Sequence, residues 1–103
     1  MKSETGNLKT DSAVVAHFVL RRHWYEEMKA GRRDIEYRSV TPYWTARLTG
    51  RTITHAIFSC GYTKLNRFIR PVTKIDIGPC PYPGLVGDFY RVHLSPMQEN
   101  SEK

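Results

Sequence analysis

Residues 31–38 place charged side chains at a spacing that suits ligand binding. The segment reads Gly-Arg-Arg-Asp-Ile-Glu-Tyr-Arg. On an extended strand successive side chains point to opposite faces, so Asp34, Glu36 and Arg38 are expected on one side. The apolar residues between them are expected to face a core. Two carboxylates and a guanidinium held out together form either a solvated face or the wall of a polar cleft.

Two further places offer an aromatic side chain that could meet a ligand, and the first of them adds two cations. The loop after Cys60 contains Tyr62, Lys64 and Arg67, and such a mixture suits single-stranded nucleic acid, in which bases stack on rings and phosphates meet cations. It also suits a solvated hairpin. Tyr43 is placed either to stack on a base or to pack with its hydroxyl at the surface.

No other pattern indicates catalysis or a metal. The four histidines are scattered singly, no Gly-x-Ser-x-Gly occurs, and Cys60 and Cys80 have no metal-ligand spacing. We therefore expect two reduced thiols, no metal and no cofactor.

The charge suggests a polyanionic partner, although many basic proteins bind none. The chain has 103 residues and a net charge of +6, and residues 13–95 alone hold thirteen cations and six acids, or +7. Ten of the sixteen cations in the chain are arginine, which suits bidentate contact with phosphate. No run of 18 apolar residues and no secretory signal is present, so a cytoplasmic protein without a membrane segment is expected.

One domain is expected at residues 13–95, between flexible tails at 1–12 and 96–103, because the ends lack apolar periodicity. The patterning predicts strands at 14–20, 33–38, 52–60, 68–77 and 89–94, and helices at 23–30 and from Thr41-Pro42 to Gly50.

Some of these elements carry more detailed expectations. The strand at 14–20 is expected to be central, and Pro71 suggests an edge or a bulge. The proline-rich segment 78–84 is expected to be a loop. On the first helix Trp24, Tyr25 and Met28 share one face, whereas Trp44 on the second is expected in the core.

The predicted element order favours an α+β fold, a small closed or half-closed β-barrel with two short helices near the N-terminus. In this setting Gly31-x-Arg33-x-x-Glu36-x-Arg38 resembles the signature of the ASCH domain family, Gly-x-Lys-x-x-Glu-x-Arg. The Pro42-Tyr43-Trp44 helix start and the Cys60-Gly61-Tyr62 strand end also resemble family features. The resemblance covers residues 14–94.

The resemblance implies a PUA-like barrel of about five to six strands and a cleft lined by the motif residues. It associates the chain with RNA or nucleotide-like ligands. Glu36 would then accept hydrogen bonds from an amine or hydroxyl, Arg38 would orient Glu36 or bind phosphate, and Arg33 would contact phosphate or stack on a base.

A few family members are amidohydrolases acting on acylated cytidines, and one is a proposed ribonuclease. In the amidohydrolases a lysine at the third motif position carries the chemistry with a hydroxyl residue three places on. Here these positions are Arg33 and Glu36, and arginine stays protonated and cannot act as an ordinary base. These two differences from the amidohydrolases argue against hydrolytic activity.

The leading hypothesis is therefore a module that binds RNA or a nucleotide-like ligand through Arg33, Glu36, Arg38, Tyr43, Tyr62, Lys64 and Arg67. The alternative is a hydrolase acting on a modified nucleoside or on RNA, with Glu36 as general base. A protein-interaction domain, using barrel edges or the proline-rich loop, is a third reading.

Overall fold

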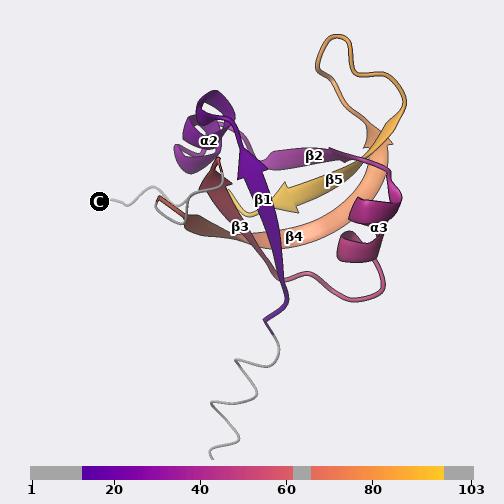
Figure 1. The fold of residues 1–103 in the computed structure, drawn as a ribbon, viewed down its shortest axis with the longest axis horizontal. Helices are drawn as coiled ribbons and strands as arrows, with labels where there is room; N and C mark the ends of the chain where they lie inside the picture. Colours follow the sequence, from indigo (N-terminus) through magenta and orange to yellow (C-terminus); the bar gives the residue numbers. More distant parts are fainter. Residues whose placement is uncertain (1–12, 62–65, 97–103) are drawn as a thin grey trace, which may run out of the picture.

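The computed structural model describes residues 13–61 and 66–96. They form a small α+β domain with a five-stranded mixed sheet and two helices (Figure 1). Apart from Pro96, the predicted tails lie outside the described residues. The elements in chain order are β1 (Val15–Leu20), α2 (Arg22–Lys29), β2 (Ile35–Ser39), α3 (Pro42–Leu48), β3 (His55–Cys60), β4 (Phe68–Pro79) and β5 (Asp88–Leu94).

The sheet has the strand order β1-β3-β4-β5-β2. β1 and β3 are parallel, and the other pairs are antiparallel. The long β4 joins the two halves, because its first residues pair with β3 and its later ones with β5, and Figure 1 shows it as a curved ribbon beneath the other strands. Within the described residues the end strands β1 and β2 do not pair, so the sheet is not closed into a barrel.

The core lies on the inner face of this curved sheet. Alternate residues of β1 and β5 supply much of it, as their period-two patterns predict. Phe18 stacks between Trp44 and Phe58, with ring centroids 5.3 and 5.5 Å away. The buried cluster comprises Ala16, Phe18, Leu20, Tyr25, Met28, Leu48, Ile53, Ala56, Phe58, Tyr90, Val92 and Leu94.

Both helices form where local signals predict them. Thr41 caps α3, since its hydroxyl accepts a hydrogen bond from the Trp44 amide at 3.2 Å and Pro42 follows in the first turn. α2 is followed by Gly31 with φ of 80°, a conformation that favours glycine. None of the helices in the described ranges has the length and apolar character needed to cross a bilayer.

The expected position of the first strand was wrong. β1 is an end strand that pairs only with β3, although its apolar sequence predicted a central one. One face of β1 is buried and the other carries the exposed Val15 and Val19. Apolar side chains on an open face cannot be distinguished from buried ones by sequence periodicity alone.

Two expectations about β4 also change. Its strand neighbours on both sides exclude an edge at Pro71, but a register shift between Val72 and Lys74 directly follows this proline, as the bulge alternative predicts. The strand then continues through Gly78 and Pro79, which were expected to lie in a loop. The absence of a side chain at Gly78 leaves room for the Arg91 guanidinium, whose carbon would lie 2.6 Å from an added Cβ atom.

Candidate functional site: a cavity between the two end strands

The orientation of β2 is opposite to that expected. Glu36 lies across from the buried Val92 of β5 and is only 4 % exposed. It therefore faces the inside of the sheet, and Ile35 and Tyr37 face the other way. Pairing with β5 decides this, because the register aligns Glu36 with the core side of its neighbour. Asp34 precedes the strand, and its carboxylate accepts a hydrogen bond from Arg70 instead.

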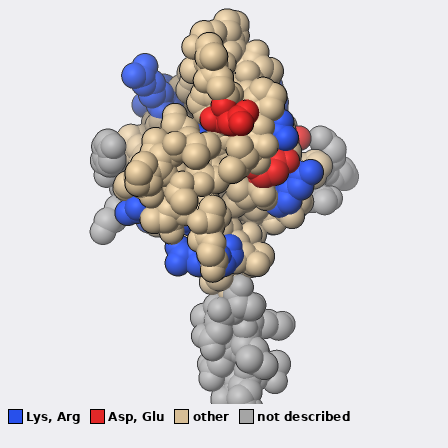
Figure 2. All heavy atoms as spheres, turned by 90° about the vertical axis from the view of Figure 1, so that its right-hand side faces the viewer, with Lys and Arg blue, Asp and Glu red and all other residues tan. Residues whose placement is uncertain are grey.

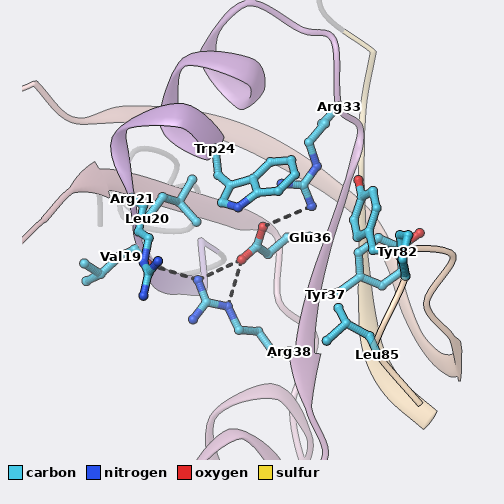
Figure 3. A pocket seen from close by; sticks show the side chains of 11 residues that line it. Val19, Leu20, Arg21, Trp24, Arg33, Glu36, Tyr37, Arg38, Tyr82 and Leu85 are labelled. Carbon is cyan, nitrogen blue, oxygen red and sulfur yellow. Dashed lines mark hydrogen bonds and ion pairs between the residues drawn. The ribbon is translucent and has the colours of Figure 1, made fainter. Parts of the chain in front are cut away.

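The buried Glu36 carboxylate is held by two arginines (Figure 3). Arg38 donates from Nε at 2.8 Å, and its Nη2 lies 2.7 Å away, both at Oε2. Arg33 Nη2 lies 3.9 Å from Oε1, which is an ion pair without a direct hydrogen bond. Burial raises the pKa of Glu36, and the charges of Arg38 and Arg33 oppose that rise. The Oε1 atom has no hydrogen-bond donor within the described residues.

Arg38 also links the two end strands. Its Nη2 donates to the Val19 carbonyl of β1 at 3.2 Å, and its guanidinium carbon lies 5.0 Å from the Trp44 ring centroid and 5.3 Å from that of Phe18. One side chain of β2 thus reaches β1 where no backbone ladder joins the strands. Within the described residues its Nη1 group has no hydrogen-bond partner.

Arg33 lies against an aromatic wall on the opposite side of Glu36. Its guanidinium carbon is 4.4 Å from the Trp24 ring centroid and 5.2 Å from that of Tyr82, within the range of cation–π contact. The Tyr82 ring also meets Trp24 and Tyr37, each at 5.6 Å between centroids. Trp24 remains 36 % exposed, so this wall offers ring surface to a ligand.

These side chains surround a cavity of about 450 Å³. Pockets for small molecules typically measure about 300–1,000 Å³. With Glu36 ionised, the three arginines of the lining leave a net charge of +2. The cavity lies between β1, β2, α2 and the β4–β5 loop, and its lining comprises Val19, Leu20, Arg21, Trp24, Arg33, Glu36, Tyr37, Arg38, Tyr82, Pro83 and Leu85.

The structure brings together three of the seven residues predicted to bind a ligand. Arg33, Glu36 and Arg38 line the cavity. Arg67 is exposed and does not line it. Tyr43 is 55 % exposed and also outside the cavity lining. The remaining two, Tyr62 and Lys64, lie outside the described residues.

Sequence reasoning missed four aromatic or basic members of the cavity, Arg21, Trp24, Tyr37 and Tyr82. Trp24 was placed on one helix face with Tyr25 and Met28, which alone are buried there. Tyr37 was expected to face a core. Tyr82 and Arg21 were not considered. Tyr82 was recognisable as the only aromatic residue of the proline-rich loop, yet no local spacing relates it to Trp24, 58 positions earlier.

The positive charge does not form one continuous surface on the α3 side of the molecule. Figure 2 shows basic side chains there at separated places, with acidic groups between them. Basic groups are concentrated instead at the cavity, where Arg21, Arg33 and Arg38 meet. No cluster of three His, Cys, Asp or Glu side chains suited to a metal exists in the part of the chain that the structure describes.

No family model, curated protein or solved structure matches this chain. The resemblance to the ASCH family stays a prediction from the motif and the element order.

Proposed function

We propose that this domain binds RNA or a nucleotide-like molecule, with a base in the cavity between β1 and β2 and phosphate at its arginines. The observation that carries the proposal is the buried Glu36 between Arg33 and Arg38, beside the rings of Trp24 and Tyr82. We also propose that the chain is an ASCH-type domain. In this proposal its PUA-like barrel is open between β1 and β2, and Arg38 bridges these two strands.

The chemistry of the lining suits the parts of a nucleotide. Glu36 Oε1 can accept a hydrogen bond from an amine or ring N–H of a base. The exposed Trp24 surface provides a stacking partner, and base–aromatic stacking contributes about 1–3 kcal/mol per base. Arg21 and the Nη1 group of Arg38 can donate to phosphate oxygens.

A purely structural role explains the buried Glu36 less well than ligand binding does. Burying a carboxylate costs several kcal/mol, by general estimates, and well-packed apolar residues often stabilise a fold as well as a buried ion pair does. Perturbed carboxylates in cavities are more typical of functional sites. The arrangement is therefore better explained by recognition than by stability.

Salt dependence of RNA binding tests the proposal. We would measure the affinity for a fluorescent single-stranded RNA of mixed sequence at several salt concentrations. Each phosphate neutralised adds about −0.7 to the slope of log K against log salt for single strands. Arg21→Met is expected to weaken binding and reduce the slope by about 0.7, because one phosphate contact is lost.

Two further variants separate recognition by the Glu36 carboxylate from a general effect of positive charge on RNA binding. Glu36→Gln keeps the shape of the side chain but removes the carboxylate, and it is expected to weaken RNA binding with little change in the salt slope. Lys74→Met is the matched control, since Lys74 is an exposed cation of β4 outside this cavity. Absent or salt-independent binding, or an equal loss with Lys74→Met, would contradict the proposal.

A second function is favoured by one observation, the burial that raises the pKa of Glu36. A carboxylate of raised pKa is a stronger general base than an ordinary one, which would suit a hydrolase. Against it, the described residues of the lining include no lysine, and Arg33 occupies the position of the catalytic lysine that the resemblance implies. Turnover of acylated cytidines or of RNA, abolished by Glu36→Gln, would establish the hydrolase.

A further inference from the structure

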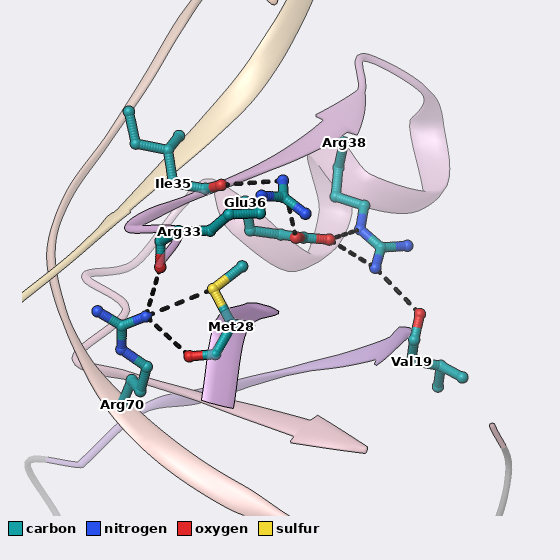
Figure 4. Close-up of polar contacts among 7 residues, drawn as sticks. All are labelled: Val19, Met28, Arg33, Ile35, Glu36, Arg38 and Arg70. Carbon is teal, nitrogen blue, oxygen red and sulfur yellow. Dashed lines mark hydrogen bonds and ion pairs between the residues drawn. The ribbon is translucent and has the colours of Figure 1, made fainter. Parts of the chain in front are cut away.

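A second buried arginine lies behind the cavity. Arg70 extends from β4 and is 1 % exposed, so it is the most buried charged residue in the described part of the chain. It is not part of the cavity lining. Figure 4 shows its contacts with Met28 and Arg33, together with the contacts of Glu36 and Arg38.

The Arg70 guanidinium joins segments that are distant in sequence. Nη1 donates to the carbonyl of Arg33 at 2.6 Å and to that of Met28 at 3.2 Å. Nη2 donates to the Asp34 carboxylate at 2.6 Å and to the Ser95 carbonyl at 2.7 Å. One group thus holds the last turn of α2, the residues before β2 and the chain after β5.

These contacts hold the backbone from which the Arg33 side chain extends. Its backbone carbonyl is fixed towards Arg70, and its guanidinium extends the other way, over Trp24 and towards Glu36. The Leu94 amide donates to the Asp34 carbonyl at 2.8 Å, so the next residue is held as well. Only the planar fork of arginine can serve several acceptors in fixed directions, which a lysine ammonium cannot do.

We propose that Arg70 is a positioning residue, which holds residues 33 and 34 by their backbone and side-chain oxygens and thereby directs the Arg33 guanidinium to Trp24 and Glu36. The ligand-binding part of this inference rests on the proposed function. The orientation of Arg33 does not, because it is a property of the protein alone.

The ligand-free test uses the indole N–H signal of Trp24 in a nitrogen–proton NMR spectrum. The chain has two tryptophans, and Trp24→Phe assigns the signals. Because the Arg33 guanidinium lies over the Trp24 ring, Arg33→Met is expected to shift this signal. Arg70→Lys is expected to shift it in the same direction, whereas the exposed Arg51→Lys leaves it unchanged. An unshifted Trp24 signal in folded Arg70→Lys would overturn the proposal.

The ligand-binding test is a double-mutant cycle with the single-stranded RNA probe. Arg70→Lys is expected to weaken binding about tenfold in the natural sequence but less than twofold in an Arg33→Met background, since coupled residues give non-additive effects. An equal loss in both backgrounds would show that Arg70 acts only through general stability. If the natural protein binds no RNA, the proposed function fails, and the Trp24 signal still decides the role of Arg70.

If Arg70→Lys does not fold, Asp34→Ala tests the same link between Arg70 and the orientation of Arg33. The Asp34 side chain is 45 % exposed, and its carboxylate contacts Arg70 Nη2. Its removal is expected to shift the Trp24 signal in the same direction as Arg33→Met, by a smaller amount. A Trp24 signal identical to that of the natural protein would overturn the proposal in this variant too.

Discussion

Replacing Arg38 by methionine is expected to destabilise the domain strongly at neutral pH. The change removes both contacts to Glu36 Oε2, at 2.8 and 2.7 Å, and leaves only Arg33 at 3.9 Å. Breaking a buried ion pair by removing one partner costs about 3–5 kcal/mol. Since the Arg38 side chain is 22 % exposed, water can reach the vacated place, and we expect about 3 kcal/mol, at the lower end of that range.

The loss should depend on pH in a defined direction. Burial already raises the folded-state pKa of Glu36 above its unfolded value, so the folded state binds the proton more tightly and stability increases as pH falls towards the unfolded value. Arg38→Met removes an opposing charge and raises the folded pKa further. Each additional unit in the folded-state pKa of Glu36 lowers the free energy of unfolding at neutral pH by about 1.4 kcal/mol. The same amount is regained when the pH is lowered and Glu36 is protonated.

Urea unfolding followed by circular dichroism, between pH 7.5 and 5, measures this effect. Adding Glu36→Gln to Arg38→Met should restore most of the loss at pH 7.5, because no charge then remains buried. The matched control is Arg32→Met, which removes an arginine from a surface ion pair with Glu27. It should cost much less stability, since exposed pairs contribute little.

Either of two results would contradict a role of the Arg38–Glu36 charge pair in stability. The first is an Arg38→Met loss below about 1 kcal/mol at neutral pH, the value typical of an exposed pair. The second is a loss that neither acid nor Glu36→Gln reduces, which would assign the stabilisation to packing against Trp44 and not to charge.

Three further changes have expected outcomes. Thr41→Ala should lower the free energy of unfolding by about 1 kcal/mol through loss of the α3 cap, and Thr41→Ser should restore most of it. Gly78→Ala should displace the Arg91 guanidinium, because a Cβ atom would meet its carbon at 2.6 Å. Since Arg91 holds the pKa of Asp76 well below its ordinary range, the Asp76 pKa measured by NMR should then rise. An unchanged Asp76 pKa would show that Arg91 keeps its contact with Asp76. Trp24→Ala should weaken RNA binding about tenfold or more if a base stacks there, with Trp24→Phe retaining most of the affinity, and equal losses for both would argue against stacking.

Local chemistry in the sequence was sufficient for several elements. The α3 helix was predictable because its start signals, Thr41 and Pro42, and its stop, Gly50, act within one or two turns. The inward face of β5, with Tyr90, Val92 and Leu94, follows from strict alternation. The arginine-rich composition and the Gly-x-Arg-x-x-Glu-x-Arg motif also directed attention to residues that line the cavity.

Only the tertiary structure decided which way the motif faces. Alternation along 34–38 divides the side chains into two sets but cannot assign either set to the core. Pairing of β2 with β5 placed Glu36 opposite the buried Val92 and moved the expected apolar face outward. A sequence rule that buries apolar residues fails here because two arginines compensate the buried carboxylate.

The cavity is likewise a product of long-range contacts. Trp24, Arg33 and Tyr82 come from a helix, a connection and a proline-rich loop, and Arg70 reaches the motif from a strand 37 residues further along the chain. Local propensity acts over a few residues, whereas strand order and register are set by the packing of the whole sheet. The sequence alone therefore pointed to Arg33, Glu36 and Arg38, and the fold brought them together with Arg21, Trp24 and Tyr82 around one cavity.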